Sequence, residues 1–366
     1  MTLTRRHLNR ATLERQLLLR RAPLSTAEAL THLAGLQAQE AQSWYVGLWS
    51  RLAAYDPSET SRLLGEASIV RVGLMRNTIH LVTADDARWL RPLLDPVIER
   101  STMGVFRRGV TGVDRDELVT AARAILAERP MQFAELGRAL ETHFPGRDPA
   151  ALGYVARAWL PLAQLPPRGQ WGRKGRALHM PLDDWLRNAP ALVPDNVRAP
   201  ERLMLRYLTA FGPATVADCR QWSGLTKLGE VVERMRPQLV TFRDEQGREL
   251  FDLPGAPRPD PDTPAPVRFL YDFDNLLLSH DDRSRVVAVD YTAQGFGYDS
   301  PEQPRSLLVD GFVAATWKLT GDRLTIRPFR RLTASEREEV EAESAALLAF
   351  LAPGRAHDLV IDKPSG

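Results

Sequence analysis

The chain has 366 residues, of which 44% are hydrophobic and 26% are charged, the balance of a soluble globular protein. Its single cysteine, Cys219, excludes an intramolecular disulfide and a cysteine-rich zinc site. No stretch approaches the roughly 20 apolar residues of a membrane span. The basic N-terminal segment lacks the apolar core of a signal peptide, so we expect a cytoplasmic protein.

The basic residues are almost all arginines. Of the 48 basic residues, 44 are arginines and only four are lysines, and the formal net charge is +2. Arginine offers a planar fork for phosphates and base edges, which fits a nucleic-acid binder. A GC-rich coding sequence would also enrich arginine, and bulk charge alone does not decide between these explanations.

The N-terminal segment predicts a first module, residues 1–112. Ser25-Thr-Ala-Glu28 has the pattern of a capping box that opens a helix. An aromatic-rich helix is expected after Ser43, followed by strands over 69–74 and 78–82. Thr83-Ala-Asp-Asp86 then caps a further helix. Helices followed by a hairpin are typical of a winged helix, a helix-turn-helix variant.

The same order of elements repeats in residues 113–188. Apolar residues at helical spacing begin at Leu118, a second helix is expected from Phe133, and Asp148-Pro149 marks the start of a third. Short apolar runs then flank a basic, glycine-rich turn, PPRGQWGRKGRALHM. We therefore predict a second winged-helix module.

A third copy is predicted over residues 199–255. Thr215-Val-Ala-Asp218 opens its second helix, and a hairpin over 240–253 surrounds Asp244-Glu-Gln-Gly247. Proline-rich stretches at 189–200 and 254–266 separate this copy from its neighbours.

Residues 267–366 predict a small β-rich α+β module. Strands are expected over 286–289, 306–318 and 324–326, a glycine-bearing loop over 291–300, and a helix over 334–352. The predicted fold class is therefore α+β, with three tandem winged-helix modules and a C-terminal β-rich module. We expect the modules to form a concave saddle for one DNA duplex.

Two charged segments are candidate sites on their own residues. Gly172-Arg-Lys-Gly-Arg176 is either a phosphate clamp on a wing or a solvated loop. An acidic cluster suggests either a metal-dependent nuclease or a cap and turn, in which the carboxylates pair with Arg283 and Arg285; the second interpretation is favoured. The cluster comprises Asp272, Asp274, His280, Asp281 and Asp282.

Four longer motifs resemble one protein family. LAGLQAQEAQSWYVGLWSRL (33–52), RNTIHLVTADD (76–86), FDNLLLSHDDRSR (273–285) and LVDGFVAATWKL (308–319) occur in the order found in the AlkZ/YcaQ family of bacterial winged-helix DNA glycosylases. The chain is similar to the AlkZ branch, which protects azinomycin producers from their own DNA cross-linking product, because YcaQ-like members carry an aspartate in place of Gln39.

The resemblance implies a base-excision enzyme in which Gln37 and Gln39 carry the chemistry, with no metal and no cofactor. Two glutamines near a turn, judged without the family, would be capping or surface groups. The implied substrate is double-stranded DNA carrying N7-alkylguanine or interstrand cross-links, and the implied product is an intact abasic site. The expected DNA contacts are Arg76, Asn77, His80, Arg168, Arg173, Lys174, Arg176 and Gln294.

Two neutral amides suit this chemistry because an N7-alkylguanine is cationic and leaves without protonation. A glutamine offers one acceptor and two donors to position water and sugar. A non-catalytic winged-helix regulator is the alternative function, since the same modules would support it. We expect a monomer associated with the nucleoid.

Overall fold

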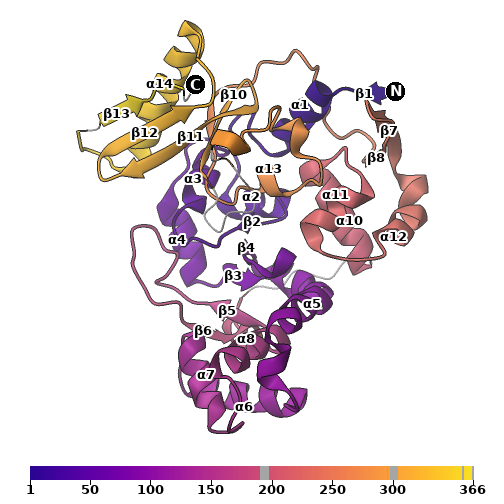
Figure 1. Cartoon of the computed structure of the whole chain (residues 1–366), viewed down its shortest axis with the longest axis vertical. Coiled ribbons are helices and arrows are strands. Elements are labelled where there is room, and N and C mark those ends of the chain that lie inside the picture. Colours follow the sequence, from indigo (N-terminus) through magenta and orange to yellow (C-terminus); the bar gives the residue numbers. More distant parts are fainter. Residues whose placement is uncertain (190–197, 295, 297–303, 357, 365–366) are drawn as a thin grey trace.

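The computed structural model describes residues 1–189, 198–294, 296, 304–356 and 358–364 (Figure 1). Helices combine with three small sheets, which confirms the mixed α+β class. None of the helices formed by these residues combines the length and hydropathy that a membrane span requires.

The N-terminal part contains helix, strand, two helices and an antiparallel hairpin in that order. The predicted caps are confirmed, because the hydroxyls of Ser25 and Thr83 accept hydrogen bonds from the N–H groups of Glu28 and Asp86. The elements are α2 (Thr26–His32), β2 (Leu36–Gln37), α3 (Trp44–Trp49), α4 (Pro57–Gly65), β3 (Ile69–Gly73), a short 3-10 turn η1 (Met75–Asn77), β4 (Ile79–Thr83) and α5 (Ala84–Phe106).

The second part has three helices followed by two strands, and its strands join the same sheet. Strand β5 pairs antiparallel with β3, so the strands run β2-β4-β3-β5-β6 across the two parts. The predicted boundary at residue 112 therefore separates helices but does not divide the sheet. The elements are α6 (Arg115–Glu128), α7 (Phe133–Glu141), α8 (Pro149–Trp159), β5 (Leu162–Gln164), β6 (His179–Pro181) and α9 (Leu182–Trp185).

The third part has three helices and a hairpin, with the Thr215 capping box present as predicted. Strand β1 (Thr2–Leu3) pairs parallel with β7, which brings the N-terminus to this part. Most of the predicted linker before it, residues 190–197, lies outside the described residues. The elements are α10 (Ala199–Phe211), α11 (Val216–Ser223), α12 (Leu228–Met235), β7 (Val240–Asp244) and β8 (Glu249–Asp252).

The C-terminal part is a five-stranded sheet covered by one helix. Its strand order is β13-β12-β11-β10-β9, and the predicted final helix is present as α14. The sheet and α14 lie at the upper left of Figure 1. The elements are β9 (Arg268–Phe269), α13 (Asn275–Leu278), β10 (Ser306–Val309), β11 (Phe312–Thr320), β12 (Arg323–Pro328), α14 (Ala334–Leu351) and β13 (Asp358–Ile361).

Two strand predictions in this part are corrected. No strand forms over 286–289, because Val286 enters the core while Val289 is 55% exposed, and this stretch joins no ladder. The predicted run 306–318 is two strands rather than one. Asp310 and Gly311 both have positive φ, at 48° and 80°, which allows the tight turn between β10 and β11.

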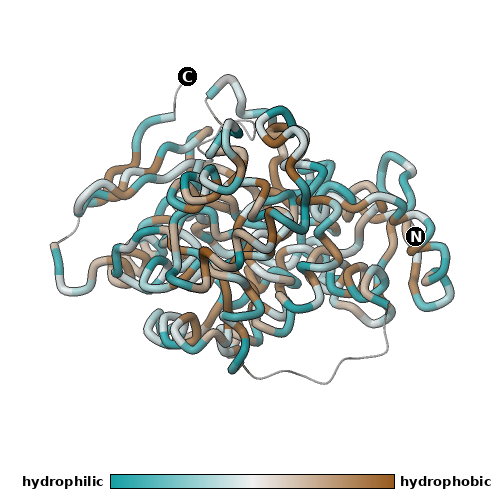
Figure 2. The backbone as a smooth tube through the Cα atoms, turned by 90° about the horizontal axis from the view of Figure 1, so that it is seen from below, coloured by the Kyte–Doolittle hydropathy of each residue, from teal (hydrophilic) through white to brown (hydrophobic). Residues whose placement is uncertain are grey.

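The sheet shared by the first two parts is buried on both faces. Val70, Val72 and Val82 face a core formed with α5 and α10–α12. Ile69 and Leu81, at alternate positions, face a second core formed with the C-terminal sheet and α14. Hydrophobic segments run through the middle of the molecule in Figure 2. Strand β2 therefore lies where the N-terminal and C-terminal parts meet.

Helix α1 (Arg5–Arg15) was not expected, because its sequence is polar. It is nevertheless buried: Asn9, Arg10 and Arg15 are at most 1% exposed. Arg15 forms two hydrogen bonds to Asp252, at 2.6 and 2.9 Å. Asn9 donates to the carbonyl oxygens of Arg285 and Gly311. The helix thus connects the third part to the C-terminal part through paired polar groups, which makes their burial tolerable.

Candidate active site

The two predicted catalytic glutamines lie where β2 ends. Gln37 pairs with His80 in the β2–β4 ladder, and the next N–H, that of Ala38, donates to the carbonyl oxygen of Ile79 at 2.7 Å. The chain then turns outward, so Gln37 is only 3% exposed whereas Gln39 is exposed. One amide is therefore held inside the protein while the other reaches the surface.

The amide of Gln37 is held by Arg76. The Oε1 atom of Gln37 accepts a hydrogen bond of 2.6 Å from Nη2 of Arg76, whose Nη1 donates to the carbonyl oxygen of Trp222. Arg76 adopts a left-handed conformation with φ 54°, a strained geometry that often marks functional turns. Burial lowers the pKa of Arg76 to about 10, so it remains charged at neutral pH.

The amide of Gln39 is oriented in the same way. Its Oε1 accepts a hydrogen bond of 3.3 Å from the N–H of Ile79. Arg76 and a peptide N–H are donors only, so each amide must direct its oxygen at them. Both NH₂ groups are thereby left to act as donors at the turn, with one lone pair remaining on each oxygen.

The turn formed by Gln37, Ala38 and Gln39, here called the QAQ turn, has its backbone held by residues far away in the sequence. The hydroxyl of Tyr271 donates to the carbonyl oxygen of Gln37 at 2.9 Å, and Nδ2 of Asn275 donates to that of Gly35 at 2.7 Å. Nη2 of Arg71 donates to the carbonyl oxygen of Ala38 at 2.7 Å. These contacts explain why the first and third motifs occur together. The sequence analysis did not identify Tyr271 or Arg71, since neither spacing nor composition links them to the turn.

Two carboxylates lie beside the glutamines. Glu40 and Asp272 line one cavity of about 1130 Å³. Asp272 is 9% exposed, and burial raises its pKa. The Ser43 hydroxyl, which hydrogen-bonds the carboxylate, and Arg305, which lies 3.9 Å from Oδ2, oppose this rise. Asp272 is thus a buried carboxylate near the QAQ turn, and its sequence context had placed it only in the acidic cluster.

Three of the expected DNA contacts surround Gln37. Arg76 touches it directly, and Asn77 accepts a 2.7 Å hydrogen bond from Arg157. His80 is fully buried, and burial together with the nearby Arg76 lowers its pKa to about 3. The imidazole is therefore neutral at physiological pH. In this structure it faces the protein interior rather than the surface.

The basic loop 168–176, the predicted wing, lies beside the QAQ turn. Nε2 of Gln42 donates to the carbonyl oxygen of Gln170 at 2.8 Å, and Oε1 of Gln42 accepts from the N–H of Gly172 at 3.2 Å. The wing's basic residues differ in their contacts. Arg173 and Lys174 are exposed, Arg168 is half-buried, and Arg176 forms an ion pair with Glu135.

The expected loop contact Gln294 is exposed and lines the same cavity as Glu40. Residues 295 and 297–300 of that loop lie outside the described residues.

The acidic cluster forms the predicted cap, and its carboxylates form ion pairs. Oδ1 of Asp282 accepts from the N–H of Ser284, and Oδ2 pairs with Arg248 at 2.7 Å. Arg285, one of the two expected partners, lies 3.9 Å from Asp218 instead. The pairing of Arg285 was not predicted because the third part packs against this segment, a contact that local sequence does not reveal.

The chain belongs to the AlkZ-like DNA glycosylase family, whose model matches residues 30–350. It is therefore a DNA glycosylase with DNA as its substrate. A curated relative from Streptomyces sahachiroi, described as an interstrand DNA cross-link repair glycosylase, is 25% identical and covers 91% of this chain and 92% of its own length. The solved structure of Streptomyces sahachiroi DNA glycosylase AlkZ superposes with a TM-score of 0.78 at 22% identity, over 99% of this chain and 100% of that one. This likeness supports the fold.

Proposed function

We propose that this glycosylase hydrolyses the glycosidic bond of N7-alkylguanine in duplex DNA, with Gln37 and Gln39 at the reacting sugar. The observation that carries the proposal is the orientation of the two amides, fixed by Arg76 and by the N–H of Ile79. Preoriented groups lower a barrier because they need no reorganisation during the reaction.

The charges at the site suit a cationic substrate. The only described histidine at the QAQ turn, His80, is neutral because its pKa is about 3, so it supplies no proton near pH 7. An N7-alkylguanine needs none, since its leaving group is already activated. Glu40 and Asp272 favour the positive charge that develops on the sugar. Asp272, a carboxylate that is 9% exposed and lines this cavity, is suited to orienting the attacking water.

We further propose that the three helix–hairpin parts act as tandem winged helices forming a saddle on one duplex. The wing bound by Gln42 then brings Arg173 and Lys174 to the DNA near the lesion. An open saddle would accommodate a guanine tied to the opposite strand, so the substrates would include interstrand cross-links of the azinomycin type and the role would be self-resistance. Such an enzyme acts on the nucleoid, and it is proposed to act as a monomer.

Water is the proposed nucleophile, and the product is an intact abasic site. A strand-cleaving glycosylase attacks with an amine through a Schiff base. Lys174 is distant from Gln37 in sequence but lies on the wing that contacts Gln42, so it is the lysine to check. Borohydride should trap no covalent adduct in the wild type, and a trapped adduct that disappears in Lys174→Gln would contradict the proposal.

The direct test measures release of N7-methylguanine from a duplex. Gln37→Ala and Gln39→Ala should each slow release by about 10²-fold, the usual effect of removing one preorganised group. Gln238→Ala, at an exposed glutamine in the 3-10 turn Arg236–Gln238, is the matched control. Wild-type rates in both site variants would refute the assignment. Binding without release by the wild type would favour the regulator.

A further inference from the structure

The cavity beside the QAQ turn extends over the outer face of the C-terminal sheet. Thr316, Lys318 and Thr320 stand at alternate positions on β11, and Thr325 and Arg327 at alternate positions on β12, and all five line it. Side chains at alternate positions share one face of a strand. The intervening residues Ala315, Leu324 and Ile326 belong to the core beneath, and Trp317 belongs to that core and also lines the cavity.

Side chains of both signs line this cavity. Glu40 and Asp272 lie at the QAQ end with Arg305, which is 3.9 Å from Asp272, whereas Lys318, Arg327 and Lys363 line the part over the sheet. Arg327 pairs with Asp362 at 3.2 Å. Lys318 and Lys363 are exposed and form no ion pair with a described residue. The cavity therefore presents uncompensated lysines and threonine hydroxyls next to an acidic end.

We propose that this cavity binds the sugar–phosphate backbone of the lesion-bearing strand, with Lys318 and Lys363 contacting phosphates. The proposal rests on the proposed function, because it takes the reacting sugar to lie at the QAQ turn. Lysine ammonium groups bind phosphate as point charges, and hydroxyls donate to phosphate oxygens. Glu40 and Asp272 favour the cationic nucleoside at the QAQ end.

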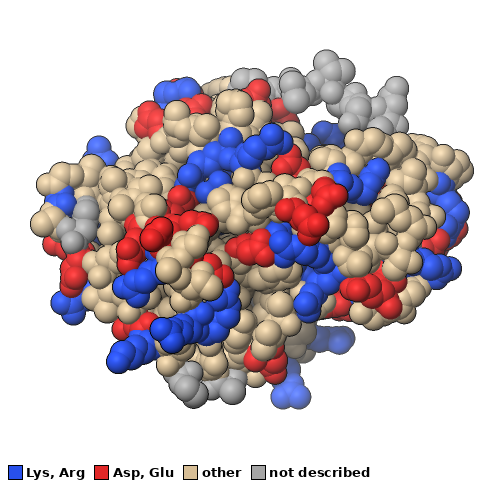
Figure 3. Space-filling view, turned by 90° about the horizontal axis from the view of Figure 1, so that it is seen from above, with Lys and Arg blue, Asp and Glu red and all other residues tan. Residues whose placement is uncertain are grey.

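The polar part of the lining suits a chain of phosphates. At about 1130 Å³ the cavity is slightly larger than the roughly 300–1000 Å³ of small-molecule sites, and charged and hydroxyl side chains line it beside the apolar Phe273, Leu319 and Phe329. Across the upper face of the molecule, basic and acidic residues are interspersed (Figure 3). The two lysines without ion pairs to described residues are therefore more informative than the overall charge of the surface.

The test is the salt dependence of binding to an unmodified duplex. Each lost phosphate contact lowers the slope of log K against log[salt] by about one, so Lys318→Gln/Lys363→Gln should lower it by about two. Arg323→Gln is the matched control, since Arg323 lies on β12, pairs with Asp358 and does not line the cavity. Because the probe carries no lesion, absence of glycosylase activity would leave this result readable.

An equal slope in the double variant and the wild type would overturn the proposal. An unchanged slope with slower release of a bulky N7 adduct, but not of N7-methylguanine, would instead assign the cavity to the adduct's substituent.

A second measurement uses the scarcity of lysine. The full chain has only Lys174, Lys227, Lys318 and Lys363, so acetylation followed by mass spectrometry resolves each amine. The duplex should protect Lys318 and Lys363 from acetylation. Equal modification of both with and without DNA would refute the proposal.

Discussion

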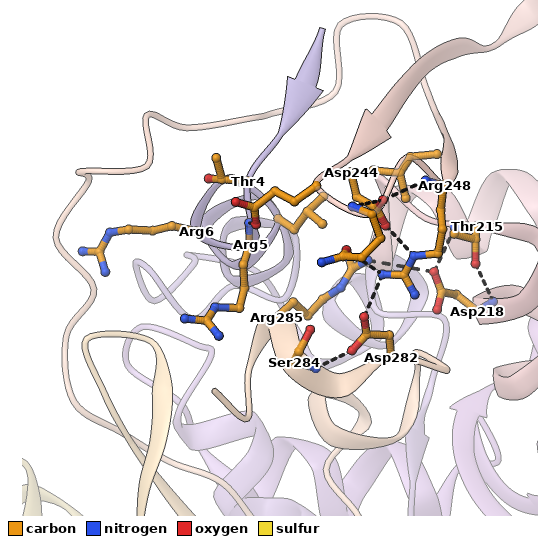
Figure 4. A pocket seen from close by; sticks show the side chains of 14 residues that line it. Thr4, Arg5, Arg6, Thr215, Asp218, Asp244, Arg248, Asp282, Ser284 and Arg285 are labelled. Atoms are coloured by element: carbon orange, nitrogen blue, oxygen red, sulfur yellow. Dashed lines mark hydrogen bonds and ion pairs between the residues drawn. The ribbon is translucent and has the colours of Figure 1, made fainter. Parts of the chain in front are cut away.

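Two cavities of the structure are lined by charged residues, and they differ in how far their basic side chains are paired with carboxylates. One, of about 500 Å³, lies between the start of α1, the β7–β8 hairpin and the segment 282–285 (Figure 4). Its Arg248 pairs with Asp244 and Asp282 at 2.5 and 2.7 Å, and Arg285 lies near Asp218. The other, beside the QAQ turn, contains Lys318 and Lys363 without ion pairs to described residues.

The comparison shows that the presence of basic residues does not identify a nucleic-acid surface, whereas the absence of carboxylate partners is informative. Three arginines of the first cavity act as structural cross-links with a carboxylate nearby, and the fourth, Arg5, donates to the carbonyl oxygen of Ala288. The three are Arg6, Arg248 and Arg285. This favours a structural explanation for much of the arginine enrichment. The few lysines are the better guide to where DNA would bind.

The largest expected effect is a loss of folding stability when a buried carboxylate of the first cavity is removed. Asp218 is 3% exposed, accepts hydrogen bonds from the N–H groups of Thr215 and Asp281, and lies near Arg285. Asp218→Ala leaves those groups buried without a partner, so we expect a loss of about 3–5 kcal/mol in the free energy of unfolding. Denaturant titration measures it. The control Asp322→Ala, at an exposed ion pair with Arg355, should cost under about 1 kcal/mol. Equal costs would show that the buried carboxylate of the first cavity stabilises the fold no more than an exposed ion pair does.

The acidic end of the second cavity should affect catalysis rather than binding. Asp272→Asn removes a buried charge while keeping the shape of the side chain, and we expect release of N7-methylguanine to slow by about tenfold. Affinity for an unmodified duplex should be unchanged or higher. Single-turnover release and anisotropy binding separate the two effects. A variant that loses binding and keeps its single-turnover rate would show that Asp272 does not act on the reacting sugar.

The exposed basic residues of the loop 168–176 are expected to contribute to the salt dependence of DNA binding as Lys318 and Lys363 do. Arg173→Gln/Lys174→Gln should lower the salt slope by about two, because neither residue is committed to an ion pair with a described residue. Arg176→Gln should lower it by less than one, since Arg176 already pairs with Glu135. A larger effect from Arg176 would mean that ion pairing in the free protein does not predict DNA contacts.

The effect of pH is the smallest of these near neutrality and grows on acidification. Burial lowers the pKa of His80, His179 and His280 from 6.5 to about 3. Below pH 6.5 the unfolded chain binds protons there and the folded chain does not. Stability is therefore complete above pH 6.5 and falls toward pH 3, by up to about 1.4 kcal/mol per pH unit for each histidine. Denaturant titrations between pH 4 and 8 test this. His280→Gln should flatten the dependence, and His143→Gln, at an exposed histidine, should not.

Local sequence predicted the local structure well and the contacts of the site poorly. The caps at Ser25, Thr83 and Thr215 and the final helix were confirmed because they depend on neighbouring residues. The choice of Gln37 and Gln39 came from family resemblance. The hydrogen bond from Tyr271 to Gln37 joins residues 234 apart in the chain, and no periodicity carries such information. Helix α1 was missed because paired polar groups, rather than an apolar face, allow it to be buried.

Helix α1 also constrains the order in which the parts of the protein can assemble. Its Arg15 and Asn9 find their partners in Asp252 and Gly311, 237 and 302 residues later in the chain. The helix remains without these partners until the chain has been synthesised as far as Gly311. Its docking with the third and C-terminal parts therefore follows the synthesis of the modules that lie between, instead of proceeding module by module along the chain.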